Sequence, residues 1–402
     1  MKQKRINGER LKTARLFNGI SLTDLANKAD ISKQSLSLYE NGKNTPDYEK
    51  VKTISKILGF PVDYFFQSDS ITIKTDTTYF RSQATATKKN RTAEKVKLEF
   101  VAQMYELLWK YVDFPIYNDP KIDFRVSDNP SDLETREVID EIESVAQRVR
   151  SRFGLDDQPI SDLQYVLEKN GIIVTGFHVQ DSKIDAFCQR TAVGKEDVFL
   201  IAVALGDKIS ECRVRFDMAH ELAHIVLHPW SEDIESLSKE DFKNREKQAD
   251  MFAGAFLLPR DSFLRDILKY PTDLNYYRHL KKKWKVSIQA MIVRARQLNA
   301  ITASQYQYMF RLLSKRGWRL SEPDDVRGEL NESIFQGAID LLFDNNILSS
   351  KLLMADFKRN GIILYPNMIE ELLHLKEGTL ETDNKIIPLV SIKNLDNNEE
   401  VL

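Results

Sequence analysis

The chain has 402 residues, of which 42% are hydrophobic, so it is long enough and apolar enough to bury the cores of two to four domains. Its net charge of −2 argues against a uniformly basic nucleic-acid binder. The sequence has no apolar run that could span a membrane, no secretory signal, and only two cysteines, Cys188 and Cys212, which together predict a cytoplasmic protein without a disulfide framework.

Residues 5–66 are predicted to form a compact series of short helices. Ser21 and Ser32 are typical N-caps of two of these helices, and Gly59 is a typical end of another. Positive charge is concentrated in this region, because residues 1–60 hold 12 Lys and Arg against 6 Asp and Glu, a local excess of 6.

The next part of the chain predicts a connection between domains. Residues 67–92 are polar, and we expect a short strand pair there, followed by a basic linker. Residues 93–112 carry apolar side chains at helical spacing, whereas the prolines of 113–132 indicate a loop. A further helix is expected over 132–153.

The middle of the chain predicts a small sheet and two long helices. After a helix over 160–171, strands are expected at 172–177, 184–191 and 197–205. The two helices that follow each end at a proline, and they cover 210–229 and 241–259. Beyond them the chain is largely helical, with its clearest helix at 285–299 and one short strand expected at 360–366.

The motif HELAH at residues 220–224 predicts a metal site. His220 and His224 lie four residues apart on one helical face, so both imidazoles can reach one ion. Glu221 directly follows the first histidine and can act as general base toward the water that such a metal activates. The alternative is a plain surface helix that is rich in histidine.

A catalytic zinc requires a third protein ligand. His228 would lie about 12 Å along the helix axis from His220, too far for the same ion, so we assign it no role beyond a helix cap. Glu246 on the second long helix is the better candidate, and Asp250, one turn further on, would fix the second nitrogen of a ligand histidine. The alternatives are a solvated charge at Glu246 and a helical ion pair at Asp250.

These two segments resemble a known family. RVRFDMAHELAHIVLHP and the later REKQADMFAGAFLLP are similar to the two sequence blocks of the ImmA/IrrE-type metallopeptidases. The resemblance implies His220, His224 and Glu246 as zinc ligands, with manganese also possible, and Glu221 as catalytic base. Tyr276, Tyr277 and His279 are candidates for stabilising the oxyanion.

Residues 21–46 predict a DNA-reading unit. Two short helices are joined by Ala29-Asp30, and the second opens with polar residues, as in a recognition helix that reads base edges near its N-terminus. The expected DNA contacts are Ser32, Lys33, Gln34, Ser35, Ser37, Lys43 and Asn44. The segment resembles the XRE, or λ-repressor, type of helix-turn-helix; a helical protein-binding module is the alternative.

The predicted fold is therefore mainly α, of the α+β class. It comprises a five-helix λ-repressor-like domain, a zincin-like peptidase with a small sheet, and a helical C-terminal region. The expected boundaries are a helix-turn-helix domain at 1–67, a linker and connecting helix at 68–131, a metallopeptidase domain at 132–300 and a C-terminal region of unassigned role at 301–402.

The sequence predicts a DNA-binding regulator with zinc-dependent endopeptidase activity. The resemblance implies a narrow protein substrate, often a repressor, whose cleavage derepresses stress, phage or mobile-element genes; the chain's own linker at 82–95 is another possible substrate. A homodimer on double-stranded operator DNA is the default for such domains. The alternatives are a transcription factor with a non-catalytic, sensing peptidase fold and an antitoxin or defence-system regulator that acts by binding.

Overall fold

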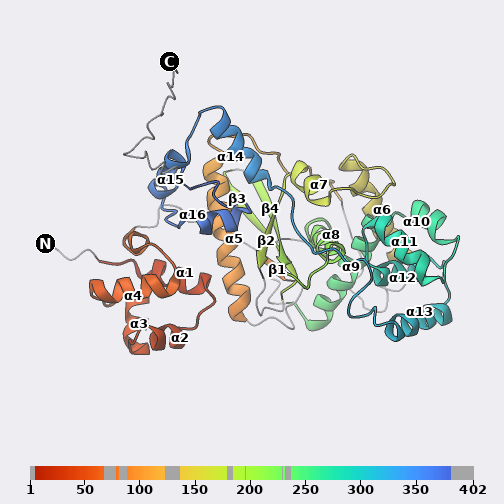
Figure 1. Ribbon diagram of the computed structural model, residues 1–402, viewed down its shortest axis with the longest axis horizontal. Helices are drawn as coiled ribbons and strands as arrows, with labels where there is room; N and C mark the ends of the chain where they lie inside the picture. Colours follow the sequence, from red (N-terminus) through yellow and green to blue (C-terminus); the bar gives the residue numbers. More distant parts are fainter. Residues whose placement is uncertain are drawn as a thin grey trace, which may run out of the picture.

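The computed structural model is elongated, with a helical N-terminal unit at one end, a small sheet in the middle and a helical unit at the other end (Figure 1). It describes residues 5–67, 78–80, 88–122, 136–178, 184–194, 196–228, 230 and 237–381. Within these residues, every helix is too short or too polar to cross a membrane.

The N-terminal unit has the predicted five helices. They are α1 (Gly8–Phe17), α2 (Leu22–Lys28), α3 (Lys33–Glu40), α4 (Tyr48–Leu58) and the 3-10 helix η1 (Val62–Phe66). The side chains of Ser21 and Ser32 cap α2 and α3 as expected, and Gly59 ends α4 in the left-handed conformation at φ 68°. This part of the fold prediction is confirmed.

The central sheet has four strands in the order β1-β3-β4-β2. They are β1 (Thr78–Phe80), β2 (Ile172–His178), β3 (Ala186–Val193) and β4 (Glu196–Leu205). β3 and β4, which only two residues separate, pair antiparallel, whereas β2 pairs with the other side of β4 and runs parallel to it. Most of β4 is buried on both faces, because helices cover both sides of the sheet.

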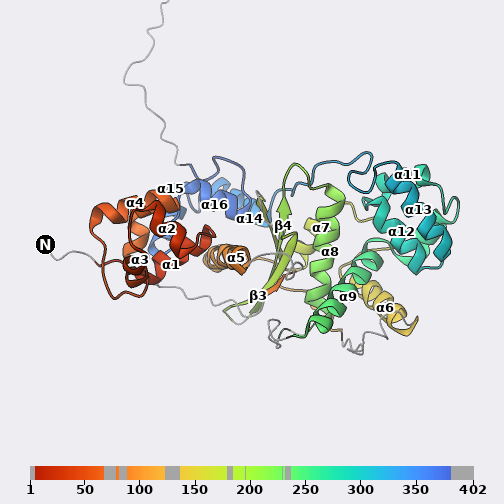
Figure 2. The same cartoon turned by 90° about the horizontal axis from the view of Figure 1, so that it is seen from below.

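The sheet separates two hydrophobic cores. On one face lie α8 (Glu211–Leu227) and α9 (Lys239–Leu257), with α6 (Arg136–Arg152) packed on α9. On the other face lies α5 (Lys88–Leu108), as the second view shows (Figure 2). Side chains therefore alternate along β3, with Cys188 in the α8 core and Phe187 in the α5 core.

Helices complete both ends of the chain. Next to the sheet lies α7 (Leu163–Lys169), and beyond α9 lie α10 (Arg260–Ile267), α11 (Leu274–Trp284), α12 (Ile288–Gln297) and α13 (Ala303–Lys315). The last described helices return to α5 and the N-terminal unit, and they are α14 (Ile334–Asp344), α15 (Ser350–Arg359) and α16 (Pro366–Leu373).

Two local predictions are wrong. Residues 88–92, expected in a basic linker, form the first turns of α5. Residues 360–366 form no strand; Ile362, Ile363 and Leu364 are buried between α15 and α16, so this apolar run fills the core without pairing in a sheet. Of the strand pair expected at 67–92, only β1 lies within the described residues, and it pairs with β3.

Candidate metal centre

Two neighbouring helices bring the predicted ligands together. α8 begins at the capping Ser210 and crosses the sheet with almost every side chain buried, so His220 and His224 project from its middle into the protein. α9 packs beside it and supplies Glu246, whose oxygens lie 3.5 Å from His220 Nε2 and 3.3 Å from His224 Nε2. One ligand atom from each of the three residues lies within 4.8 Å of the others.

The tautomer of His220 is fixed by Asp250. The Nδ1 atom of the ring lies 2.8 Å from Asp250 Oδ1, and a carboxylate can only accept, so Nδ1 carries the proton. The Nε2 atom of neutral His220 then presents a lone pair toward Glu246. This is the arrangement in which a metal-binding histidine is oriented by a carboxylate.

A second chain of hydrogen bonds fixes the tautomer of His224. Gln248 Oε1 lies 3.0 Å from His228 Nε2 and accepts its proton, so neutral His228 has a lone pair on Nδ1. That atom accepts from His224 Nδ1 at 2.8 Å, which leaves the lone pair of His224 on Nε2. Burial lowers the pKa of His228 well below its ordinary value and keeps it neutral.

The sequence prediction for His228 was incomplete. It is not among the three residues whose ligand atoms converge, and it occupies the C-cap position of α8. Its ring, however, also links His224 to Gln248, a residue that the sequence reading did not single out. The available signal was spacing, because His228 follows His224 by one helical turn and Gln248 lies two residues after Glu246.

The donor set fits a divalent metal. The Nε2 atoms of His220 and His224 lie 3.1 Å apart, and the hydrogen bonds at Nδ1 leave both with lone pairs that repel unless a cation lies beside them. Burial opposes ionisation of Glu246, but imidazoles that carry a proton on Nε2 outweigh it and lower its pKa to about 2; when both Nε2 atoms are unprotonated, a bound cation would supply the charge that keeps Glu246 a carboxylate. Two imidazoles and one carboxylate are a common ligand set of catalytic zinc.

Glu221 lies next to these donors in a dry environment. Its side chain is fully buried, and no nitrogen or oxygen of the described residues hydrogen-bonds either carboxyl oxygen; the polar group that interacts with it is the thiol of Cys188. Burial raises its pKa above the ordinary value, so the group favours the protonated form more than an exposed glutamate does. The buried thiol of Cys188 on β3 lies close to it, and burial together with the charge of Glu221 raises the pKa of that thiol.

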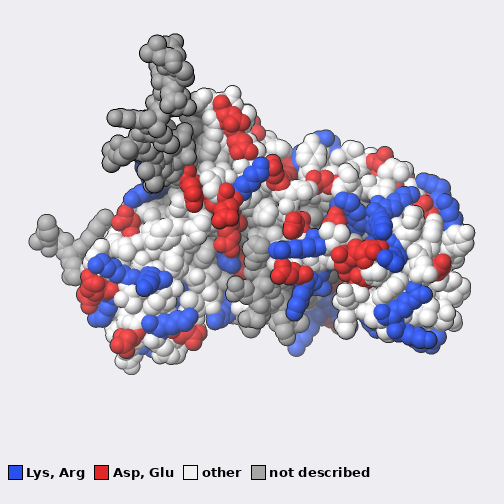
Figure 3. Space-filling model, viewed as in Figure 1, with Lys and Arg blue, Asp and Glu red and all other residues white. Residues whose placement is uncertain are grey.

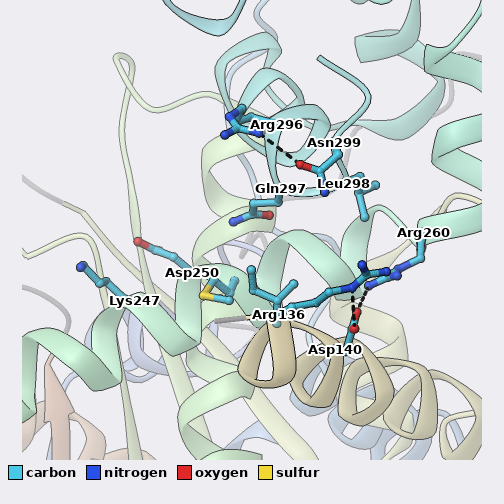
Figure 4. A pocket seen from close by; sticks show the side chains of 11 residues that line it. Arg136, Asp140, Lys247, Asp250, Arg260, Arg296, Gln297, Leu298 and Asn299 are labelled. Carbon is cyan, nitrogen blue, oxygen red and sulfur yellow. Dashed lines mark hydrogen bonds and ion pairs between the residues drawn. The ribbon is translucent and has the colours of Figure 1, made fainter. Parts of the chain in front are cut away.

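A cavity of about 700 Å³ opens beside Asp250 (Figure 4). Four cationic side chains line it, one from each of four helices or their ends, and they are Arg136, Lys247, Arg260 and Arg296. Asp140 neutralises part of this charge through ion pairs with Arg260 at 2.6 Å and Arg136 at 3.5 Å. The cavity shares Asp250 with the metal site but is lined by none of the three ligands, and its cationic side chains favour acidic groups.

The candidates for the oxyanion role have other partners. The hydroxyl of Tyr276 donates to the Asp266 carbonyl at 3.0 Å, and that of Tyr277 donates to the Pro271 carbonyl at 3.0 Å. Both phenols therefore hold the start of α11 in place. His279 stacks near Tyr276, at 6.3 Å between ring centroids.

In the N-terminal unit, α2 and α3 are joined by a tight turn. Asp30 takes the left-handed conformation at φ 50° there, as expected for Ala29-Asp30. Lys33 and Gln34 at the start of α3 are exposed, and so are Lys43 and Asn44 after its end. Acidic side chains lie among the Lys and Arg of this unit on the face seen in Figure 3.

The three predicted serines of α3 have partners within the protein. Ser32 Oγ accepts from the Ser35 amide at 3.1 Å and lies 2.9 Å from Ser35 Oγ, so both hydroxyls belong to the N-cap. Ser37 Oγ accepts from Asn41 Nδ2 at 3.4 Å. Base contact by Ser35 or Ser37 would therefore compete with these bonds, whereas Lys33 and Gln34 are available.

Comparison with known families supports the interpretation of both the N-terminal helical unit and the domain that holds the metal centre. Residues 8–71 match the model of a helix-turn-helix domain, and residues 171–296 match the peptidase M78 model, described as an IrrE N-terminal-like domain. The second match runs from β2 to α12 and contains His220, His224 and Glu246. No curated protein matches the chain significantly. The chain thus joins a helix-turn-helix DNA-binding domain to an IrrE N-terminal-like domain of the M78 peptidases, with a His-His-Glu metal-binding group at its centre.

Proposed function

We propose that this protein is a transcriptional regulator that hydrolyses peptide bonds at the His220, His224 and Glu246 site. The observation that carries the proposal is the position of Glu221. A site that only binds metal for stability does not require a fully buried carboxyl group next to the ligands that lacks any nitrogen or oxygen partner. A peptidase requires such a group as its general base.

The residues of the chain have separate roles in this reaction. Zinc, or manganese in the same donor set, supplies Lewis-acid activation of water and of the scissile carbonyl. Glu221 takes a proton from the attacking water and delivers it to the leaving amine. Asp250 and the His228–Gln248 pair keep both ligand imidazoles in the binding tautomer.

The helix-turn-helix domain binds double-stranded DNA, and we propose that α3 enters the major groove. Gln34 would pair with adenine, and Lys33 with guanine or phosphate. Lys43 and Asn44 would contact phosphates, since they lie exposed after the end of α3. Two copies of the chain on two half-sites are the arrangement expected for this type of domain.

The proposed substrate is a protein, either a specific repressor or the chain itself. Cleavage would derepress stress, phage or mobile-element genes. Of the linker at 82–95, residues 82–87 lie outside the described residues, and residues 88–95 are helical in α5. Since a peptidase binds an extended backbone, self-cleavage within 88–95 would require the first turns of α5 to unwind.

The experiment compares the wild-type chain with Glu221→Gln, because this substitution keeps the shape of the side chain and removes the base. Both are loaded with zinc, their metal content is measured, and each is incubated with a peptide library made from a bacterial proteome. Cleavage sites are identified by mass spectrometry. The expected result is one zinc per chain in both proteins and a narrow set of cleaved sequences with the wild type alone.

Two results would contradict the proposal. Zinc-loaded wild type that cleaves no peptide and does not cleave itself would leave a DNA-binding protein with a sensing fold. Equal cleavage by Glu221→Gln would show that another group, or a contaminating protease, performs the reaction.

A further inference from the structure

The edge of the sheet beside the metal centre is occupied by the chain itself. β3 lies between β4 and β1, so β1 covers the outer edge that β3 would otherwise expose. The pair is antiparallel, with Thr78 opposite Gln189, Tyr79 opposite Cys188 and Phe80 opposite Phe187. This segment lies between the helix-turn-helix domain and α5.

The covered edge borders the proposed catalytic group. Cys188 belongs to the core on the α8 face of the sheet, and its thiol interacts electrostatically with both Glu221 and Glu246. α8, which carries Glu221, packs directly across β3 and β4. The backbone of residue 79 is therefore about one strand spacing, ~4.8 Å, from the strand position that faces Glu221.

A sheet edge is a binding surface for an extended peptide. Its unpaired amides and carbonyls hydrogen-bond an added strand and hold that strand straight, so that its own carbonyls are presented in a regular order. A site that cleaves peptide bonds needs its substrate in this extended form. β3 is the only described strand with both features, an outer edge and a side chain beside Glu221.

We propose that the outer edge of β3 is the peptide-binding surface of this site, and that residues 78–80 of the same chain occupy it in cis. They act there as an internal competitor of the substrate. This inference rests on the proposed peptidase function. The partner it implies is an extended, unfolded segment of a protein, not a folded domain.

The connections of β1 favour its occupancy. Eleven residues, 67–77, separate it from the end of η1, and seven residues, 81–87, separate it from the start of α5. Both anchors belong to one hydrophobic core, in which Phe17 of α1 and Phe60 contact Phe100 of α5. A segment tethered at both ends has an effective concentration in the millimolar range, so a free peptide at micromolar concentration competes poorly with it.

The position of β1 also links the two functions. β1 follows the DNA-binding domain after eleven residues, so a rearrangement of that domain on its operator would act through this short connection on the strand that fills the peptide-binding edge. Displacement of three residues from β3 is a small change compared with unfolding a domain. The edge is thereby closed to substrates until β1 is released.

Fluorescence anisotropy tests this with a labelled peptide of residues 75–84, TDTTYFRSQA, and the full chain. The protein carries Glu221→Gln, so the peptide is bound and not cut. Replacing Thr78, Tyr79 and Phe80 by proline removes every amide hydrogen that β1 can offer to β3. The expected result is at least tenfold tighter peptide binding than in the chain with β1 intact, and no tighter binding of a scrambled peptide.

A disulfide supplies the opposite perturbation and does not depend on the proline variant. A cysteine introduced by Tyr79→Cys would lie directly opposite Cys188, where Cα atoms of an antiparallel pair are ~4.5–5.5 Å apart, within the range for a disulfide. Oxidation should lock the edge and abolish peptide binding, and dithiothreitol should restore it. Tyr79→Ser, which cannot form the bond, should not respond to oxidation.

The inference is overturned if peptide affinity is the same with β1 intact and substituted, or if it is unchanged once the disulfide has formed. Hydrolysis is measured separately, with Glu221 present and the same peptide. A chain that binds the peptide competitively but, with zinc and Glu221 present, cuts neither it nor any peptide of the library nor itself would refute the peptidase function and keep the edge as a peptide-binding surface. A chain that cuts substrates equally well with β1 locked would refute the edge and keep the peptidase.

Discussion

Gln248 should control zinc affinity although it does not touch the metal group. Its Oε1 accepts the Nε2 proton of His228, and this bond decides which nitrogen of His228 can accept from His224. Gln248→Leu keeps the approximate volume of the side chain but removes the acceptor. His228 can then place its proton on Nδ1, in which case His224 carries its own proton on Nε2, where the metal should bind.

The expected loss of zinc affinity follows from the number of protons that His224 and His228 share. One proton lies between His224 Nδ1 and His228 Nδ1 across 2.8 Å, and both rings are buried, so water cannot replace the lost acceptor. Substitution of residues that orient metal ligands typically lowers affinity by about 10- to 100-fold. This corresponds to about 1.4–2.7 kcal/mol, and we expect Gln248→Leu within that range.

The assay is competition for zinc with a chromophoric chelator at constant pH. The control is Gln164→Leu, because Gln164 is also a buried glutamine, 3% exposed against 5% for Gln248, but lies away from the site on α7. Both variants should lose some thermal stability, and only Gln248→Leu should lose zinc affinity. A dissociation constant within twofold of wild type for Gln248→Leu would refute the hydrogen-bond argument.

Three further changes test the site and the fold. Asp250→Ala removes the acceptor of His220 Nδ1 and should weaken zinc binding about tenfold or more in the same chelator assay. Burial raises the pKa of Glu168 from 4.5 to about 8, so between these pH values the native state retains a proton that the unfolded state loses. The free energy of unfolding should therefore fall by up to about 4 kcal/mol from pH 4.5 to pH 8. In urea titrations, the free energy of unfolding of Glu168→Gln should depend less on pH over this range. Glu40→Ala leaves Arg15 buried without its carboxylate and should destabilise the helix-turn-helix domain by about 3–5 kcal/mol in urea titrations, whereas Arg15→Met with Glu40→Leu should lie nearer wild type.

The metal centre could be predicted because its residues lie at helical spacing. His220 and His224 are one turn apart, and Glu246 and Asp250 repeat this spacing on the next helix, so packing of two helices suffices to join them. The caps of α2 and α3 were equally local, since each depends on a serine and the amide three residues later. Both kinds of feature follow from short-range geometry.

Features that depend on long-range packing were not predicted. The role of Gln248 requires the relative rotation of α8 and α9, which spacing within either helix does not determine. A short strand pair was expected within 67–92, but the pairing of residues 78–80 with β3 joins positions more than 100 residues apart, which no local pattern indicates. Ile362–Leu364 have the apolar composition of a buried strand, but they pair with no described strand and form a buried connection between α15 and α16.

The shared core explains why the DNA-binding domain and the sheet form one continuous structure. Arg10 in α1 donates to the Gly361 carbonyl at 3.0 Å, and Asp63 of η1 forms an ion pair with Lys358 at 2.8 Å. The C-terminal helices therefore hold the helix-turn-helix domain against α5, on the face of the sheet opposite the metal centre. Since the sheet separates the two cores, a change at the DNA-binding domain can reach the metal centre only through the sheet or past its edge. Of these routes, the β1–β3 edge joins the DNA-binding domain to the metal centre by the shortest path along the chain, and β1 is the shortest strand of the sheet.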